Sequence, residues 1–337
     1  MGCPNQCVFC NQRSISGHQA FDRSNVETQI ERALATIEEG GEVEIAFFGG
    51  SFTGIDRALM IDLLETAERY VRQGAVDSIR LSTRPDYISE EILAILSRYT
   101  VKTIELGLQS MDDRVLNASM RGHSAKQARD ACKTVVRAGF SLVGQMMIGL
   151  PQSTLQAELE TAKTICEMGA SAARIYPTVV FYETPLCEMV KNGTYLPLTV
   201  EDAVCRSAEV LKIFLEHNVP CIRIGLCAGE DFSSDDKVMV GPNHPSLGEM
   251  VWGEIYYEKL IVSLVKNNLL GKETVLFLPA REISKFVGQH RCNLKRLLRE
   301  TDTRVRKIVG KNNLERPMPV LWQNGALQSE EEKPQCI

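Results

Sequence analysis

Between residues 24 and 225, short apolar runs rich in β-formers alternate with longer amphipathic stretches, and this rhythm constrains the fold more than any other feature. Parallel strands need long crossover connections, so the rhythm favours a parallel sheet covered by helices. The strand count and length favour a partial or closed (β/α) barrel over an open sheet. The expected strands, each ending near Gly, Pro or Ser, are 43–48, 78–82, 103–108, 141–148, 173–177 and 221–224.

Amphipathic periodicity predicts helices between these strands. Ser124, Ser153 and Thr199 are expected at or beside helix N-caps. Only two residues precede Cys3, where a strand would normally open such a barrel, so we expect the first strand to be missing through truncation or because the barrel is naturally open. The predicted helices are 25–39, 57–72, 89–98, 112–119, 124–137, 154–168 and 200–217.

The pattern divides the chain into four parts. Residues 1–225 form the core barrel, and 226–270 form an irregular connector that ends in a helix from Pro245 to Asn267. Residues 271–310 form a small basic α+β unit. The tail, 311–337, carries an acidic run and is expected to be disordered.

Composition excludes several protein classes. Of 337 residues, 44% are hydrophobic and 24% charged, with a net charge of -5, as in globular proteins rather than disordered or collagen-like chains. No apolar run reaches the roughly 18 residues of a membrane span, and the N-terminus lacks a secretory signal. We therefore expect a cytoplasmic protein with no membrane partner. Its 11 cysteines are then expected to be reduced.

Three of those cysteines crowd into the first ten residues. Cys3, Cys7 and Cys10 follow the spacing C-x3-C-x2-C, with Phe9 before the last cysteine. Three thiolates on one short loop can hold a 4Fe-4S cluster and leave one iron without a cysteine, so that a small molecule can bind there. The alternatives are structural zinc, which lacks a matching second cysteine pair here, and a ferredoxin-like carrier with a distant fourth cysteine.

This motif resembles the signature of the radical S-adenosylmethionine (SAM) superfamily. The resemblance implies that the three thiolates hold a 4Fe-4S cluster whose unique iron chelates the methionine part of SAM. An electron from a low-potential donor such as flavodoxin or ferredoxin would then cleave SAM to methionine and a 5'-deoxyadenosyl radical, which abstracts hydrogen from the substrate.

A glycine pair follows the first predicted strand, in FFGGSFTG. Taken alone, Gly49-Gly50-Ser51 reads as a plain strand-to-helix turn, but its position resembles the superfamily motif that contacts the amino group of the methionine moiety. Polar side chains near other strand ends are expected at the same barrel rim, where ligands bind. The expected cofactor-binding residues are Gly49, Gly50, Ser51, Arg84, Glu105, Gln109, Gln145 and Arg174, whereas the catalytic residues that act on the substrate stay unknown.

The order of the segments TRPDYI, ELGLQS, RGH, GLP and IYPT resembles the radical domain of the Elongator catalytic subunit family, over about residues 2–215. That family modifies the wobble uridine of transfer RNA. Two departures stand out: we expect this protein to lack the acetyltransferase domain of that family, and Arg174 stands where lysine is expected. Arg121 and His123 of the RGH segment could contribute to the same rim, or they could instead cap a helix or pair with carboxylates of the loops.

The small unit at 271–310 resembles a KH module, whose GxxG loop clamps a nucleic-acid backbone. Arg291 replaces the second glycine of that loop. Between Arg281 and Lys307, nine Lys or Arg face three acidic residues, a balance typical of phosphate contact. A solvated amphipathic helix is the alternative. The expected RNA-binding residues are Gly288, Arg291, Lys295 and Arg296.

Together these features predict a radical SAM enzyme that uses a 4Fe-4S cluster and modifies an RNA base, most plausibly in transfer RNA. Two alternatives stay open at this point. One is an oxidase of a tetrapyrrole precursor, of the coproporphyrinogen type. The other is a non-catalytic RNA-binding protein with a relict cluster loop.

Overall fold

The computed structural model describes residues 6–10, 21–37, 41–226, 237–323 and 326–327. The chain divides into two compact units, Met1–Pro245 and Ser246–Ile337. Within the described residues, no helix is both long and apolar enough to cross a membrane.

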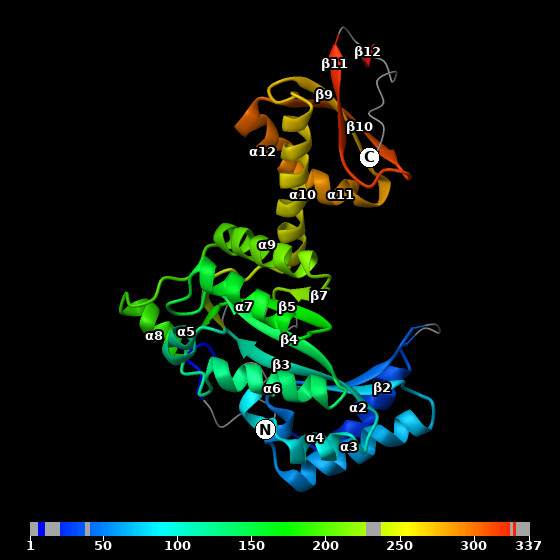
Figure 1. The fold of residues 1–337 in the computed structure, drawn as a ribbon, viewed down its shortest axis with the longest axis vertical. Coiled ribbons are helices and arrows are strands. Elements are labelled where there is room, and N and C mark those ends of the chain that lie inside the picture. The colour runs from blue at the N-terminus through cyan, green and yellow to red at the C-terminus, as the bar shows by residue number, and fades with distance from the viewer. Residues whose placement is uncertain (1–5, 11–20, 38–40, 227–236, 324–325, 328–337) are drawn as a thin grey trace. The chain divides into compact units, whose positions relative to one another are not determined.

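The first unit is built on a sheet of six strands in which every neighbouring pair is parallel (Figure 1). The sheet is a curled half-barrel, open between its two outer strands, so the sequence-based prediction of a partial barrel is confirmed. In spatial order the strands are β1 (Glu44–Phe47), β2 (Ser78–Thr83), β3 (Val101–Gln109), β4 (Ser141–Ile148), β5 (Ala172–Pro177) and β7 (Cys221–Ile224).

Helices connect the strands, as the rhythm of the sequence predicts. Ser124 and Gln127 form a reciprocal capping box at the start of α6, and Thr199 caps α9, but Thr154 rather than Ser153 caps α7. A short antiparallel pair, β6 (Val180–Phe181) and β8 (Val238–Val240), was not predicted. The helices are α2 (Asn25–Leu34), α3 (Arg57–Arg72), α4 (Glu90–Leu96), α5 (Asp113–Ala118), α6 (Ala125–Arg137), α7 (Leu155–Glu167), α8 (Pro185–Lys191) and α9 (Val200–Glu216).

The two faces of the sheet differ in chemistry. On the helix-covered face, Ile79, Leu81 and Ile104 are fully buried. Gly144 lies so close to α7 that an added Cβ would stand 2.6 Å from Ile165, which explains a glycine in the middle of a strand. Alternate residues of the same strands are polar and line the concave face. This alternation leaves polar groups inside the half-barrel.

The second unit packs α10 (Leu247–Lys266) against a four-stranded sheet. The sheet order is β10-β9-β11-β12, with β10 parallel and β11 antiparallel to β9. Its core joins Leu260 and Leu264 of α10 to Leu276 and Phe286. The other elements are β9 (Glu273–Pro279), α11 (Ile283–Val287), α12 (Cys292–Thr301), β10 (Arg304–Lys311), β11 (Met318–Gln323) and β12 (Ala326–Leu327).

Two of the expected boundaries differ from the structure. The helix assigned to a connector over 226–270 belongs instead to the second unit, because its apolar face completes that unit's core. The expectation of disorder from residue 311 onward is wrong for β11, which pairs with β9 along four residues from Met318 to Leu321. Residues 328–337 lie outside the described part of the chain.

Candidate active site

The cysteine loop is fixed by backbone hydrogen bonds to two helices. Val8 donates its N–H to the carbonyl of Ser119 at the end of α5 (3.1 Å) and accepts from Leu186 in α8 (2.9 Å). The buried Val8 side chain packs against Val180 and Leu186. These contacts hold Cys7 and Cys10 on one tight turn, in which Cys10 N–H donates to Cys7 (3.0 Å). Cys3 lies outside the described residues.

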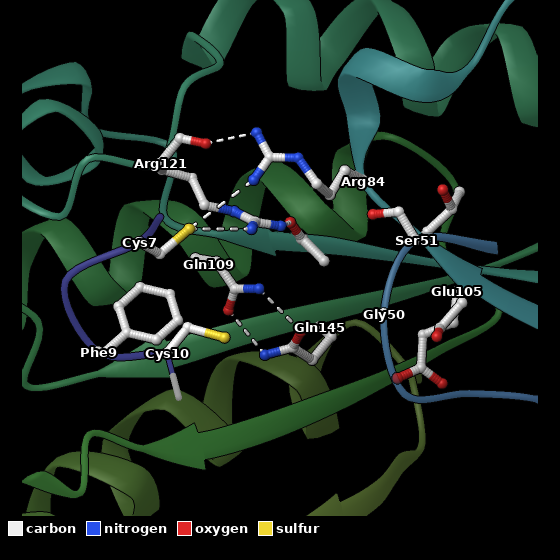
Figure 2. Close-up of a pocket in the computed structure, with 13 residues that line it drawn as sticks. Cys7, Phe9, Cys10, Gly50, Ser51, Arg84, Glu105, Gln109, Arg121 and Gln145 are labelled. Atoms are coloured by element: carbon white, nitrogen blue, oxygen red, sulfur yellow. Dashed lines mark hydrogen bonds between the residues drawn. The ribbon is translucent and has the colours of Figure 1, made fainter. Parts of the chain in front are cut away.

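Cys7 and Cys10 open into a cavity of about 170 Å³ at the carboxyl ends of the strands (Figure 2). Most of the residues expected to bind a cofactor line this cavity. It is lined by Cys7, Phe9, Cys10, Gly50, Ser51, Ser82, Thr83, Arg84, Glu105, Gly107, Gln109, Arg121 and Gln145.

Two buried guanidinium groups contact the Cys7 sulfur (Figure 2). Nη1 of Arg121 lies 3.4 Å from Sγ, and Nη1 of Arg84 lies 3.8 Å from it. Asp86 accepts two hydrogen bonds from Arg84 (2.9 and 3.1 Å), and the carbonyl of Gly107 accepts one from Arg121 (2.6 Å). Two positive charges so close to the Cys7 sulfur favour an anionic group there.

His123 lies beside this pair without adding a third charge. Its Nδ1 is 3.9 Å from Asp86. Burial, together with the positive charges of Arg121 and Arg84, lowers the pKa of His123 to about 4. The imidazole is therefore neutral near pH 7.

A reciprocal amide pair forms another wall. Gln109 Nε2 donates to Gln145 (3.0 Å), and Gln145 Nε2 donates back (2.8 Å). Gln109 has a φ of 67°, and the β3–β4 register shifts between Gly107 and Gln109. A Cβ on Gly107 would stand 3.0 Å from both Arg121 Nη2 and Gln109 Nε2, so any side chain there would have to displace these two groups from the cavity wall.

A second cavity, of about 510 Å³, adjoins the first and shares Glu105, Gln109 and Gln145 with it. Glu105 is 5% exposed and forms an ion pair with Arg174 (2.9 Å). Burial raises the pKa of Glu105 more than the neighbouring arginines lower it. The lining of this second cavity also includes Phe9, Phe48, Gly49, Ser82, Met147, Arg174, Tyr176, Pro177, Val179, Phe181, Arg223 and Leu226.

The glycine pair after β1 lies at both cavities, with Gly50 at the first and Gly49 at the second. Gly49 has a φ of 102°, a conformation that side chains rarely adopt. Apart from its two chain neighbours, no atom of the described residues lies within 4 Å of the position a Cβ would take on Gly49. The turn therefore exposes backbone directly to open space.

The residues expected to bind RNA lie in the second unit and differ in what they contact. Gly288 has a φ of 74°, and a Cβ there would stand 2.4 Å from the Cys292 sulfur. Arg291 and Lys295 are exposed. Arg296 pairs with Glu300 and Glu254 and lies 4.1 Å from the Tyr257 ring centroid, so its contacts are internal to the unit.

Family models decide the affiliation. The model described as the radical SAM superfamily matches residues 1–165. The model described as the radical SAM C-terminal domain matches residues 170–257, so the two models together span most of the chain. The chain belongs to the radical SAM superfamily.

Several curated relatives match parts of this radical SAM chain. An uncharacterised protein of Methanocaldococcus jannaschii is 28% identical over 236 residues, covering 66% of this chain and 71% of that protein. Elongator complex protein 3 of Saccharomyces cerevisiae is 26% identical over 249 residues, covering 62% and 45%. A tRNA uridine(34) acetyltransferase of Methanocaldococcus infernus is 30% identical over 127 residues, covering 37% and 24%. The chain thus spans less than half the length of the two named enzymes.

Among solved structures, the archaeal Elp3 of Methanocaldococcus infernus with an N-terminal deletion has a TM-score of 0.56. It is 22% identical, and the match covers 74% of this chain and 60% of that one. This likeness establishes a shared fold. The predicted resemblance to the Elongator radical domain is therefore supported by both sequence and fold.

Sequence reasoning did not include Arg121 or Arg223 among the site residues, although both line the cavities. The sequence alone favours a role for Arg121 in capping or in pairing with loop carboxylates, but its guanidinium contacts the Cys7 sulfur. Its place in the RGH segment was the available signal. Nothing local in the sequence marks Arg223, because its position depends on pairing of β7 with β5.

Proposed function

We propose that this chain holds a 4Fe-4S cluster through Cys3, Cys7 and Cys10, binds SAM, and modifies a base of RNA, in particular transfer RNA. The observation that carries the proposal is that Cys7 and Cys10 open into one cavity with two buried arginines and the polar ends of the strands. A soft sulfur donor set beside positive charge suits a cluster ligated by thiolates, whose net charge is negative.

When bound, the cluster supplies the electron that cleaves SAM to a 5'-deoxyadenosyl radical. The chain's own residues bind and orient the cluster and SAM. Arg84 and Arg121 offset negative charge at Cys7. Gly49, Gly50 and Ser51 offer backbone groups to the methionine moiety of SAM, and Arg84, Glu105, Gln109, Gln145 and Arg174 offer the polar side chains that complete its site.

Transfer RNA as the partner is supported by the relative named for uridine-34 of tRNA and by the exposed cations Arg291 and Lys295 of the second unit. The reducing partner would be a low-potential donor such as flavodoxin or ferredoxin. The proposed division of labour places chemistry in the first unit and RNA capture in the KH-like second unit.

The direct test is anaerobic reconstitution with iron and sulfide, followed by incubation with SAM, reductant and total RNA. We expect release of 5'-deoxyadenosine and a new nucleoside detected by mass spectrometry of digested RNA. Release of 5'-deoxyadenosine without any RNA product, together with oxidation of coproporphyrinogen, would transfer the proposal to a tetrapyrrole substrate. Binding of RNA without a cluster or SAM cleavage would indicate a non-catalytic binder.

Salt dependence tests the RNA-binding role of the second unit. The double variant Arg291→Ala/Lys295→Ala should bind RNA more weakly, because two fewer phosphates are neutralised. The log–log slope of affinity against salt should become shallower by about two. Affinities at several salt concentrations measure this slope.

The matched control for this test is Lys133→Ala/Arg137→Ala, which removes two exposed cations from α6 in the first unit. Arg296 is left intact because it supports the unit through Glu254 and Glu300. Equal salt-dependence slopes in the parent and the test variant would mean that the basic segment is only a solvated helix face and does not bind RNA phosphates.

A further inference from the structure

The concave face of the half-barrel carries a row of charged side chains that the proposed chemistry does not use in full. Two ion pairs form within it, Glu44 with Arg80 (3.2 Å) and Glu105 with Arg174 (2.9 Å). The row therefore contains three cations and two anions, so one positive charge is left over. Its members, from five strands, are Glu44, Arg80, Glu105, Arg174 and Arg223.

The remaining charge lies on Arg223 of β7. Arg223 is aligned with Arg174 on the neighbouring strand β5. Its guanidinium makes no hydrogen bond or ion pair with any residue of the described ranges, although it lines the 510 Å³ cavity. Glu105 attracts Arg223 through its charge, but its close ion pair is with Arg174. A half-buried guanidinium that makes no hydrogen bond within the described residues is suited to an anion from outside the chain.

The walls of the same cavity are aromatic. Phe48, Tyr176 and Phe181 contribute rings to its lining. Phe48 is 52% exposed, and the guanidinium carbon of Arg174 lies 5.5 Å from its ring centroid, so the ring already serves as a surface for a planar group. Aromatic faces bind unstacked bases, and arginine forms charge-assisted hydrogen bonds to phosphate.

We propose that this second cavity, which also offers Gly49 and Arg174 to SAM, takes one nucleotide of the RNA, with its base against the aromatic wall and an adjacent backbone phosphate paired with Arg223. This deepens, and rests on, the proposed RNA-modifying function. Arg223 is then a specificity-determining residue, since it selects a base that is attached to a phosphate. Arg223 lies far from the cysteine loop along the sequence. The two come together only when the half-barrel has folded.

A coupling experiment tests this proposal on the reconstituted full chain. The probe is a fluorescent five-nucleotide single-stranded RNA with a central uridine, in which one phosphate at a time is replaced by a neutral methylphosphonate. For the parent, we expect one replacement next to the uridine to weaken binding about tenfold, the effect of losing one charge-assisted contact. Arg223→Gln should weaken binding of unmodified RNA by the same factor.

The decisive result is non-additivity. Neutralising that one phosphate should cost Arg223→Gln nothing further, and Arg223→Lys should recover part of the affinity. The control Arg32→Gln removes an exposed cation from α2 and should retain the parent's sensitivity to the same phosphate. Additive losses at every position would overturn the proposal, as would an RNA affinity too weak to measure in the parent.

Two further outcomes separate this proposal from the proposed function. If Arg223→Gln lost affinity for SAM as strongly as for RNA, Arg223 would belong to the cofactor site and the proposal would fail. If coproporphyrinogen, a tetracarboxylate, bound the parent and lost affinity in Arg223→Gln while RNA did not, the anion would be a carboxylate. Absence of SAM cleavage in the parent would refute the proposed function but leave the phosphate coupling measurable.

Discussion

Replacement of Cys7 by alanine is expected to abolish both the iron–sulfur absorbance and the cleavage of SAM. Cys7 is buried beside two guanidinium groups and opens into the cavity, so alanine removes a ligand that no described neighbour can replace. Iron and sulfide content, the visible spectrum and 5'-deoxyadenosine release measure the effect.

The matched control for this prediction is Cys166→Ala on α7. Burial raises the pKa of the Cys166 thiol to about 11, so at neutral pH it stays protonated and is a poor metal ligand. This variant should keep its cluster and its activity. A cluster retained in Cys7→Ala, or lost equally from both variants, would remove Cys7 from the ligand set.

The second large effect is expected from Gly107→Val. The first atom of the new side chain would already lie 3.0 Å from Arg121 and Gln109, and the added methyls would enter the 170 Å³ cavity. Overpacking costs about 1–3 kcal/mol, and a cost of that size in the SAM-bound state lowers the affinity for SAM about 5- to 150-fold. Anaerobic equilibrium dialysis with SAM measures the change, and iron content measured in parallel separates it from loss of the cluster.

Gly41→Val is the control for this substitution. Within the part of the chain that the structure describes, no atom other than those of its chain neighbours lies within 4 Å of a Cβ at Gly41, and its φ is not in the left-handed region. It should bind SAM like the parent. If Gly107→Val also bound SAM within about twofold of the parent, the smaller cavity would not be the SAM site.

Much of the barrel could be predicted because its strands and helices carry strong local patterns. The bounds of α3, β4 and β7 agree with the expected ranges to the residue. Each has its periodicity bounded by a turn signal nearby. In contrast, α8 is seven residues long and begins at Pro185, too short for helical periodicity to show.

The second unit was harder to predict because its elements depend on distant partners. The sequence of α10 looks like a generic helix, and only its contacts with Leu276 and Phe286 assign it to that unit. The strand β11 contains Pro319 and lies near an acidic tail, both of which suggest loop or disorder. Pairing with β9 overrides that local signal.

In the candidate site, too, some residues could be predicted from local patterns and others depend on distant partners. Cys7, Gly50 and Gln145 were predicted because motif spacing and strand ends place them at one rim. The contact of Arg121 with the Cys7 sulfur spans 114 positions along the chain. No local pattern encodes a contact of that range, and only the folded half-barrel reveals it.

The amide pair of Gln109 and Gln145 has a consequence for what the cavity can recognise. Each amide gives one N–H to the other and accepts one, and Gln145 Nε2 also donates to the Met146 carbonyl at 3.5 Å. If both amides rotate by half a turn together, the two reciprocal bonds re-form and only this longer bond is lost. That concerted rotation exchanges the outward N–H of each amide with its outward lone pair. At one position, the wall can therefore bind either a hydrogen-bond donor or a hydrogen-bond acceptor of a ligand. The change from one to the other needs no backbone movement.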